Sequence, residues 1–566
     1  MTTGRAAALV AVLVAGASLL SLRGYGVTFD EPSLLYAGDR TVFFVRHPRT
    51  PGALDYNAPE PPDFHSAFAR WPNHFDPIHY PVLPGFVAAL SSRLLHERLG
   101  WLGVIDGHHA GLVLLNAVSL FLFCWYACNL LGGIAGVSAT IALALYPTAV
   151  SHSFNDAKDW PSAMLYGLTI LSGGLGILRA EPRHVIASAV FLAASMACKA
   201  NAAFAAATLL VWFPIGMLVL RQRALPKPTA VRLIAALLVA PILAFALWVL
   251  VWPWLWSGGP SALVPRIKDY YQWVRDYGIT PRTSFTDFPL RCLVTMSPPL
   301  LLVASSLGLV SIVQARGQKL AAEALVLLWL VVPLLRIAWP HSNFYDANRH
   351  FIEYIPALCA LGGSGVAAAL EWIRARAPIP RGALVGAAIA SCAALAWPVV
   401  EYHPYEGTYF NFLVGGLGEA QRRALFKVAG ASDLRVWGTE GDYWNSSVRD
   451  GVREAFKHVA GDGLIGICGW PQTAVFNVDP PLRQRFVDWN GLDDVPVIYV
   501  LPREGLCGWE KVRKLESERP ILKRVERGGG LIYEVLGGKS PVPLKPVSPP
   551  SRYMRDASDN PQSASQ

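Results

Sequence analysis

The chain has 566 residues, of which 53% are hydrophobic and only 16% are charged, with a formal net charge of +9. Ordinary soluble domains are about 45–50% apolar and about 25% charged, so this composition excludes an ordinary soluble enzyme, a disordered protein and a collagen-like fibre. It indicates an integral membrane protein, in which excess Lys and Arg belong to cytoplasmic loops. Membrane lipids are therefore expected partners, and nucleic acid is not.

Eleven stretches are apolar and long enough to be predicted as membrane-spanning helices. A span needs about 20 mostly apolar residues, because unpaired backbone polar groups are not tolerated in hydrocarbon. The short stretch 184–198 and the proline-containing stretch 292–314 leave the count open by about one or two. The first stretch has an alternative interpretation as a cleaved signal peptide. The predicted spans are residues 6–22, 108–130, 133–151, 161–178, 184–198, 202–220, 232–254, 292–314, 322–339, 350–372 and 383–400.

Basic residues in the short loops predict the orientation of these spans. Lys and Arg occur in the loops at 179–183, 221–232, 316–319 and 374–381. Because cytoplasmic loops carry the excess of Lys and Arg, the N-terminus is predicted inside and everything after residue 400 outside. The chain is thus expected to be a multi-pass protein of the cytoplasmic (inner) membrane with an extracytoplasmic C-terminal part.

The predicted organisation has three parts. Residues 1–400 form an α-helical polytopic membrane module with long outer loops at 23–107 and 255–291. Residues 401–540 turn to a soluble composition and predict a small α/β domain, whereas the Pro/Ser-rich tail 541–566 is predicted to be disordered. The expected strands and helix of the small domain are residues 434–437, 464–468, 495–501 and 447–459.

The cysteines bear on the outer domain, where the question is whether two of them form a disulfide. Eight cysteines are too few for a disulfide scaffold in a chain of this length. Cys468 and Cys507 each begin a Cys-Gly-Trp sequence. An oxidising compartment permits a disulfide between them, and two buried free thiols are the alternative.

Two acidic clusters are predicted at the same depth on the outer face. Asp30 and Glu31 follow the first span, and Asp156 and Asp159 follow the third. Asp is also a favoured helix N-cap, so helix capping is the alternative interpretation of each cluster, and the two roles do not exclude each other. Because carboxylates near a bilayer are costly, two clusters at one level indicate a functional site.

Basic residues gather at the same level. Lys199 stands at the outer end of the fifth span, and Arg349 and His350 open the tenth. Two of the basic residues also have structural interpretations. Arg349 could form an i,i+4 ion pair with Glu353, and Arg336, at the end of the ninth span, could snorkel to the membrane surface. Cations beside carboxylates suit an anionic headgroup, for which phosphate is the simplest choice.

Three further candidates lie in the outer loops, namely Tyr36, His79 and His341. A lone histidine is also common as a structural residue, which is the alternative interpretation of His79.

Taken in order along the chain, these motifs resemble the GT-C membrane glycosyltransferases, in the branch of protein O-mannosyltransferases and lipid A aminoarabinose transferases. The sequence departs from that family at His79-Tyr80-Pro81, where members usually have His-Pro-Pro or Lys-Pro-Pro, and in its 401–540 domain. The motifs that carry the resemblance are Asp30-Glu31 with Tyr36, His79-Tyr80-Pro81, Asp159-Trp160-Pro161, Arg349-His350-Phe351 before Ile355-Pro356, His403-Pro404-Tyr405, Tyr409-Phe410-Asn411 and Asp442-Tyr443-Trp444.

The resemblance implies a GT-C fold of about 11 transmembrane helices and a sugar transfer at the outer face. A hexosyl or pentosyl group would pass from a polyprenyl-phosphate-linked donor to a lipid, glycan or protein acceptor, usually with inversion. The alternative function is a secondary transporter or lipid flippase. A transporter should bury its ionisable groups near the bilayer midplane, whereas here they lie at the outer ends of spans, which favours the enzyme.

The resemblance also implies roles for the candidate residues. Asp30 would be the general base that takes the acceptor proton, with Glu31 beside it. Asp159, with Asp156, would orient the acceptor, a sugar hydroxyl or a metal ion. Whether a divalent cation such as Mg²⁺ or Mn²⁺ takes part is left open, and Asp30 and Asp159 would be its ligands. The residues expected to bind the donor phosphate are Lys158, Lys199, Arg349 and His350.

Overall fold

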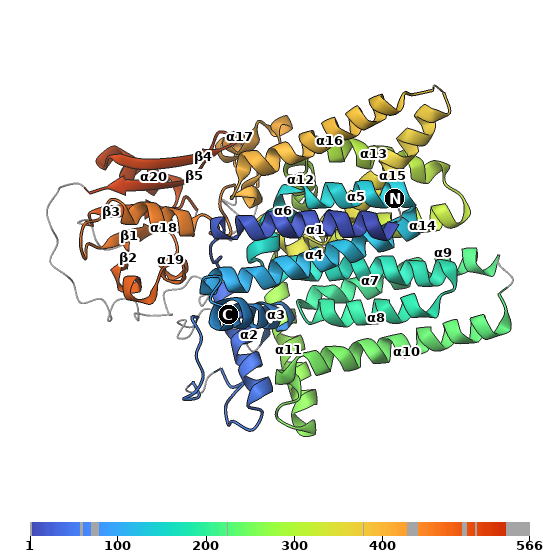
Figure 1. The fold of residues 1–566 in the computed structure, drawn as a ribbon, viewed down its shortest axis with the longest axis horizontal. Coiled ribbons are helices and arrows are strands. Elements are labelled where there is room, and N and C mark those ends of the chain that lie inside the picture. The colour runs from blue at the N-terminus through green and yellow to red at the C-terminus, as the bar shows by residue number, and fades with distance from the viewer. Residues whose placement is uncertain are drawn as a thin grey trace.

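The computed structural model describes residues 3–56, 60–68, 79–222, 225–376, 378–426, 440–489, 495–503 and 507–538. Figure 1 shows a bundle of long helices that run side by side, with a small sheet at one end of the bundle. The predicted strand at 434–437 and the predicted disordered tail at 541–566 lie outside the described residues.

Eight helices of the described chain are long and apolar enough to cross a membrane, which confirms the polytopic class. Two helix pairs, each bent at a break, qualify as further spans only if each pair is counted as one: α5 (Gly133–Ala144) with α6 (Pro147–Asn155), bent by 64°, and α12 (Phe288–Met296) with α13 (Pro299–Gln314), bent by 117°. The unbroken spans contain α1 (Thr3–Ser21), α4 (Val104–Leu131), α7 (Asp159–Arg179), α9 (Ala203–Arg221), α10 (Lys227–Val251), α14 (Gly317–Ala338), α15 (Tyr354–Arg374) and α16 (Arg381–Tyr402).

The remaining predicted span, residues 184–198, corresponds to a helix that is shorter than the unbroken spans. It is α8 (Pro182–Met196), which has 15 residues. At 1.5 Å per residue this helix is about 22 Å long, less than the roughly 30 Å thickness of a bilayer's hydrocarbon core. Within the described residues, up to ten helices or bent helix pairs therefore qualify as spans by length and composition, instead of the eleven predicted.

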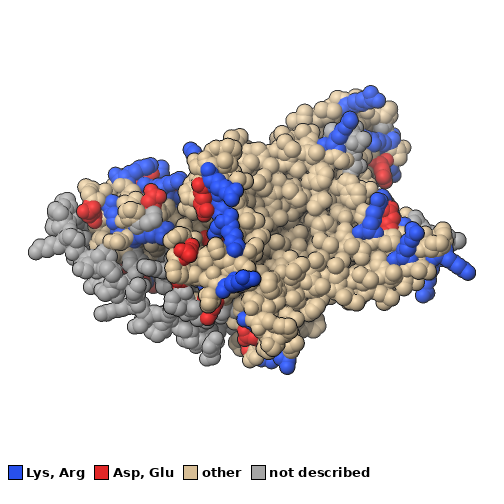
Figure 2. Space-filling view, turned by 60° about the horizontal axis from the view of Figure 1, so that its bottom comes forward, with Lys and Arg blue, Asp and Glu red and all other residues tan. Residues whose placement is uncertain are grey.

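The surface of the bundle suits contact with lipid. Figure 2 shows Lys, Arg, Asp and Glu near the ends of the bundle, with a broad region free of charged side chains between them on the face drawn. Where the exposed side chains of such a region are apolar, the surface is one that meets a membrane or a partner. On α10 alone, the side chains that are at least half exposed include Val231, Ile234, Leu238, Ile242, Phe245 and Leu250.

Three helices outside the spans lie at the end of the bundle where Asp30 is found. They are α2 (Glu31–Arg46), α3 (Leu83–Ser92) and α11 (Pro260–Gly278). Helices α2 and α3 cross closely, because Gly38 and Gly85 face each other: a Cβ on Gly38 would lie 2.1 Å from the carbonyl oxygen of Gly85. This crossing packs α2, and with it Asp30 at its start, against the bundle.

The C-terminal part of the chain forms a five-stranded mixed sheet in the order β2-β1-β3-β5-β4. Strand β1 is parallel to β2 and β3, and β5 is antiparallel to β3 and β4. Cys468 at the end of β1 forms a disulfide with Cys507, which decides between the two interpretations of these cysteines. The elements are α17 (Gly416–Arg423), α18 (Val448–Phe456), β1 (Ile465–Cys468), α19 (Pro471–Phe476), β2 (Phe486–Asp488), β3 (Val497–Val500), α20 (Trp509–Glu518), β4 (Ile521–Arg527) and β5 (Gly530–Gly537).

Candidate functional site

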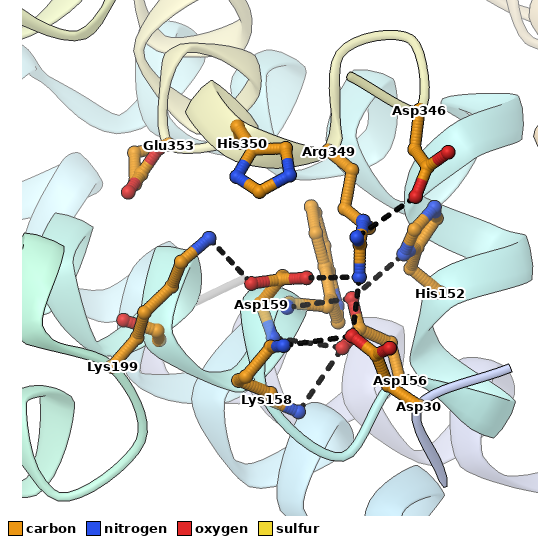
Figure 3. A network of polar contacts seen from close by, with 12 residues as sticks. Asp30, His152, Asp156, Lys158, Asp159, Lys199, Asp346, Arg349, His350 and Glu353 are labelled. Carbon is orange, nitrogen blue, oxygen red and sulfur yellow. Dashed lines mark hydrogen bonds and ion pairs between the residues drawn. The ribbon is translucent and has the colours of Figure 1, made fainter. Parts of the chain in front are cut away.

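Asp30 occupies the N-cap position of α2, but its carboxylate is directed to two cations. The Oδ2 atom accepts hydrogen bonds from Lys158 Nζ at 2.8 Å and from Arg349 Nη1 at 2.6 Å (Figure 3). The side chain is buried, and it makes no capping hydrogen bond to the described residues of α2. Asp30 thus marks the start of α2, while its carboxylate pairs with Lys158 and Arg349.

Asp159 forms the second acidic centre of the same network. It is the first residue of α7, and its Oδ1 atom lies 2.5 Å from Lys199 Nζ. Its Oδ2 atom lies 3.6 Å from Arg349 Nη1. Arg349 therefore stands between the two carboxylates Asp30 and Asp159, as Figure 3 shows.

Asp346 completes the acidic surroundings of Arg349, and the expected pair with Glu353 does not form. Arg349 Nη2 donates to Asp346 Oδ2 at 2.8 Å. A 3₁₀ turn spans Arg349–Phe351 and α15 begins only at Tyr354, so Arg349 and Glu353 are not on one α-helical face.

Glu353 instead pairs with Arg336, and this changes the interpretation of that arginine. Arg336 Nη2 lies 3.4 Å from Glu353 Oε2 and donates to the carbonyl oxygen of His350 at 2.5 Å. The Arg336 side chain is mostly buried, so these contacts, rather than snorkelling, hold it.

Asp156 is engaged by the turn between α6 and α7. Its Oδ1 accepts from the backbone N–H of Lys158 at 3.0 Å and of Asp159 at 2.7 Å, and its Oδ2 accepts from the backbone N–H of Trp160 at 3.0 Å. His152 Nδ1 also lies 2.7 Å from Oδ2. The capping role considered for Asp159 thus belongs to Asp156, which holds Lys158 and Asp159 in place.

Burial and charge act against each other on the ionisable groups of this network. Burial alone would raise the pKa of Asp30, but Lys158 and Arg349 more than offset it, so the pKa of Asp30 is lowered. The pKa of Lys158 is raised, because Asp30 and Asp159 outweigh burial. The pKa of Lys199, in contrast, is lowered by burial despite the neighbouring Asp159. Asp30 is therefore ionised and held by cations, which makes it a weak base in this state.

His350 differs from the cations with which it was grouped. Burial, reinforced by the charges of Arg349 and Lys199, lowers the pKa of His350 well below its ordinary value. Its Nε2 atom has no hydrogen-bond partner among the described residues. A neutral imidazole can still offer a hydrogen bond to a ligand, so the expectation that His350 binds the donor phosphate stays a prediction.

The other predicted residues make contacts of their own. Glu31 Oε2 accepts from the backbone N–H of Thr28 at 3.0 Å, and its Oε1 lies 2.8 Å from His109 Nε2. The Tyr36 hydroxyl donates to Glu60 Oε1 at 3.1 Å.

The two predicted histidines of the outer loops lie on other elements. His79 stacks on Trp273 of α11 with ring centroids 5.2 Å apart, and its Nε2 lies 2.9 Å from Asp269 Oδ2. The exposed His341 has its Nδ1 3.1 Å from the carbonyl oxygen of Thr280. These contacts of Tyr36, His79 and His341 join outer elements to one another, while Lys158, Lys199 and Arg349 converge on the carboxylates.

The carboxylates do not fit the divalent cation that the sequence left open. Within the described part of the chain, no group of three or more His, Cys, Asp and Glu side chains is placed to hold a metal ion. Asp30 and Asp159, the expected ligands, already face Lys158, Lys199 and Arg349.

Sequence reasoning missed three members of the network. Asp346 lies three residues before Arg349, and this spacing was its only signal. His152 supports Asp156 from one helical turn earlier in the chain. Trp444, whose ring centroid lies 4.0 Å from Arg349 Cζ, belongs to the Asp442-Tyr443-Trp444 motif but carried no expected role.

Comparison with known proteins gives structural likeness alone. No protein-family model and no curated protein matches the chain. The apo structure of ArnT from Cupriavidus metallidurans is similar, with 14% identity, 93% of this chain and 97% of that chain covered, and a TM-score of 0.48. The structure of the same protein bound to undecaprenyl phosphate has 16% identity, the same coverage and a TM-score of 0.48.

The apo oligosaccharyltransferase of Archaeoglobus fulgidus is also similar, with 12% identity, 84% of this chain and 64% of that chain covered, and a TM-score of 0.43. Identities and TM-scores this low carry no argument about the activity of this chain.

Proposed function

We propose that this chain is a membrane glycosyltransferase that moves a sugar from a polyprenyl-phosphate-linked donor to an acceptor at the outer face of the cytoplasmic membrane. The observation that carries the proposal is the convergence of Lys158, Lys199 and Arg349 on Asp30 and Asp159. A buried cluster of cations beside an ionised carboxylate, at the ends of apolar helices, suits an anionic lipid headgroup and a proton acceptor together. The basic short loops support an orientation in which this end of the bundle, and the C-terminal sheet, lie outside the cytoplasm.

In the proposed reaction, the acceptor oxygen or nitrogen attacks the anomeric carbon of the donor sugar. The new glycosidic bond forms as the bond from that carbon to the phosphate oxygen breaks. Asp30 takes the acceptor proton, and the leaving phosphate keeps the electron pair of the broken bond. Lys158, Lys199 and Arg349 stabilise the charge that develops on the phosphate.

The same contacts link donor binding to the strength of the base. Lys158 and Arg349 hold the pKa of Asp30 low when no other anion is present. A donor phosphate competes for these two cations, and a carboxylate that loses cationic neighbours has a higher pKa. Asp30 thus becomes a better base when the donor is bound, which ties proton removal to the presence of the substrate.

The test is transfer of radiolabelled sugar from a panel of polyprenyl-phosphate sugars to endogenous acceptors in membranes. Asp30→Asn should lower the transfer rate by roughly 10²–10⁴-fold, the usual contribution of a general base. Asp462→Asn, at an exposed position of the outer part, is the matched control and should retain wild-type transfer. Equal transfer by Asp30→Asn and wild type would remove Asp30 as the base.

The acceptor class follows from the fraction that carries the label, because lipid, glycan and protein acceptors separate on extraction. A secondary transporter or flippase would move a labelled polyprenyl-phosphate sugar across the membrane without transferring its sugar. No label in any acceptor with every donor tested, together with such movement, would replace the enzyme with that alternative.

A further inference from the structure

The C-terminal sheet unit, defined here as the described residues from 440 to 538, reaches into the network around Arg349. Trp444 covers the guanidinium of Arg349 at 4.0 Å, and its carbonyl oxygen accepts from the backbone N–H of Phe29 at 3.3 Å. Arg503 Nη2 donates to Asp346 Oδ1 at 2.7 Å, while its Nη1 donates to the carbonyl oxygen of Tyr443 at 2.7 Å. One arginine of the sheet unit therefore contacts both the acidic partner of Arg349 and the segment that carries Trp444.

We propose that Arg503 is a positioning residue of the sugar-transfer site, supplied by the C-terminal sheet unit. It takes one oxygen of Asp346, so that Arg349 keeps positive charge for the donor phosphate. It also holds Trp444 over the guanidinium plane of Arg349. This inference rests on the function proposed above and assigns a role to a part of the chain whose role the sequence left open.

The charges around Arg349 explain why a further cation matters. Three carboxylates, those of Asp30, Asp159 and Asp346, face the three cations Lys158, Lys199 and Arg349. Three negative and three positive charges leave no excess for an anionic ligand. Arg503 adds a fourth cation, which contacts Asp346 and offsets part of the negative charge that these carboxylates and the neighbouring Asp156 bring to the network.

The two oxygens of Asp346 are divided between two arginines. Oδ2 accepts from Arg349 and Oδ1 accepts from Arg503. Both side chains of the second pair are shielded from solvent, with exposed fractions of 11% for Arg503 and 2% for Asp346. Because water screens charges only weakly there, removal of Arg503 would leave Arg349 as the arginine that neutralises the Asp346 carboxylate. Arg349 would then have less positive charge to offer a phosphate.

Arg503 is itself held firmly by the sheet unit. It forms an antiparallel bridge with Cys507, whose carbonyl oxygen accepts from the Arg503 backbone N–H at 3.0 Å. The disulfide ties Cys507 to Cys468 at the end of β1, and the backbone N–H of Leu501 donates to the carbonyl oxygen of Cys468 at 2.9 Å. The Arg503 backbone is thus joined to the sheet through Cys507 and its disulfide with Cys468.

The sheet unit is fixed to the membrane part by further buried contacts. Arg449 Nη1 donates to Asp106 Oδ1 of α4 at 2.7 Å and to the carbonyl oxygen of Tyr25 at 2.7 Å. The Asn477 side chain accepts from the backbone N–H of Val27 at 2.8 Å and donates to its carbonyl oxygen at 3.2 Å. These contacts hold the two parts in the register that brings Arg503 to Asp346.

The experiment uses the full chain in detergent or nanodiscs, with Arg503→Gln, Arg503→Lys and the control Arg513→Gln. Arg513 is exposed on α20 of the same sheet unit. Arg503→Gln should raise KM for the polyprenyl-phosphate sugar about 10-fold, the scale of a lost hydrogen bond to a charged group, and change kcat much less. Arg503→Lys should recover part of that loss, because it restores the charge without the two-pronged geometry. Arg513→Gln should behave as wild type.

A direct binding measurement with undecaprenyl phosphate keeps the inference separate from the proposed reaction. Weaker binding by folded Arg503→Gln than by wild type supports the positioning role, and equal KM and equal binding overturn it. If Arg503→Gln does not fold, Trp444→Leu takes its place and must also raise KM, and an unchanged KM then overturns the proposal. Absence of transfer by the wild type would instead refute the proposed function.

Discussion

The interaction of Lys158 with Asp30 leads to a quantitative prediction for the substitution Lys158→Met. Lys158 Nζ lies 2.8 Å from Asp30 Oδ2, and the side chains of both residues are buried. At an effective dielectric constant of about 20, two unit charges at that distance attract by about 6 kcal/mol. At 1.36 kcal/mol per pKa unit, this sets an upper limit of about four units on the change in the pKa of Asp30.

Arg349 reduces the expected change, because it remains 2.6 Å from the same oxygen after the substitution. Loss of a single nearby opposite charge usually raises the pKa of an Asp by about one to three units. We expect a shift of this size for Asp30 in Lys158→Met. The sign is upward, since removal of a cation favours the protonated, neutral carboxyl group.

The assay is the pH dependence of kcat/KM for sugar transfer, which reports on ionisable groups of the free enzyme. In the wild type the pKa of Asp30 lies below its ordinary value of 3.8, so the acidic limb should lie below that pH. In Lys158→Met this limb should move to higher pH by about one to three units. The control Lys268→Met removes an exposed cation of α11 and should leave the limb in place.

The stability of the folded chain should follow the same linkage. An Asp with a lowered pKa in the folded state stabilises the fold above its unfolded-state pKa, and this contribution is lost as the pH falls through the folded-state pKa. Lys158→Met should lose that contribution. An acidic limb of Lys158→Met that coincides with the wild-type limb would refute the assignment of Asp30 as the base coupled to Lys158.

Two further predictions concern the stability of the fold. Gly38→Ala should lower the unfolding free energy by about 1–3 kcal/mol, because its Cβ would lie 2.1 Å from the backbone oxygen of Gly85. In the control Gly386→Ala, the new Cβ meets nothing within 4 Å. Thermal unfolding in detergent measures both variants, and an unchanged midpoint for Gly38→Ala would contradict the close crossing of α2 and α3. Replacing Cys468 and Cys507 by Ser should destabilise the sheet by about 4 kcal/mol, the chain-entropy value for a closed loop with the observed separation of 39 residues, and should abolish any effect of a reductant on unfolding. A wild-type unfolding curve that does not respond to reductant would count against the disulfide.

Local signals in the sequence were sufficient for the membrane class and for several of the acidic and basic residues that the structure brings together. Apolar runs mark spans because the bilayer imposes a minimum length, and all eleven predicted stretches are helical in the structure, although α8 is too short to qualify as a span. Asp30 and Asp159 were found because charged residues beside apolar runs are rare and costly.

Local signals failed where a side chain chooses among several nearby partners. The sequence allowed Asp159 to cap α7, but Asp156 accepts the backbone N–H groups there, while Asp159 turns to Lys199. Arg349 had a suitable partner in Glu353, but the 3₁₀ turn after Asn348 directs the two residues apart. Such choices depend on the exact path of the backbone over one turn, which composition and spacing do not specify.

The sequence by itself thus determined a polytopic helical protein with acidic and basic residues at one end of its spans. Only the tertiary structure decided which of them pair. Asp30 and Arg349 are separated by 319 positions, and Asp346 and Arg503 by 157. Each pair forms because helix packing and the docking of the sheet bring the partners within hydrogen-bond distance. Hydrophobic patterning places residues at a depth in the membrane, whereas the partner of a buried charge is selected by packing in three dimensions.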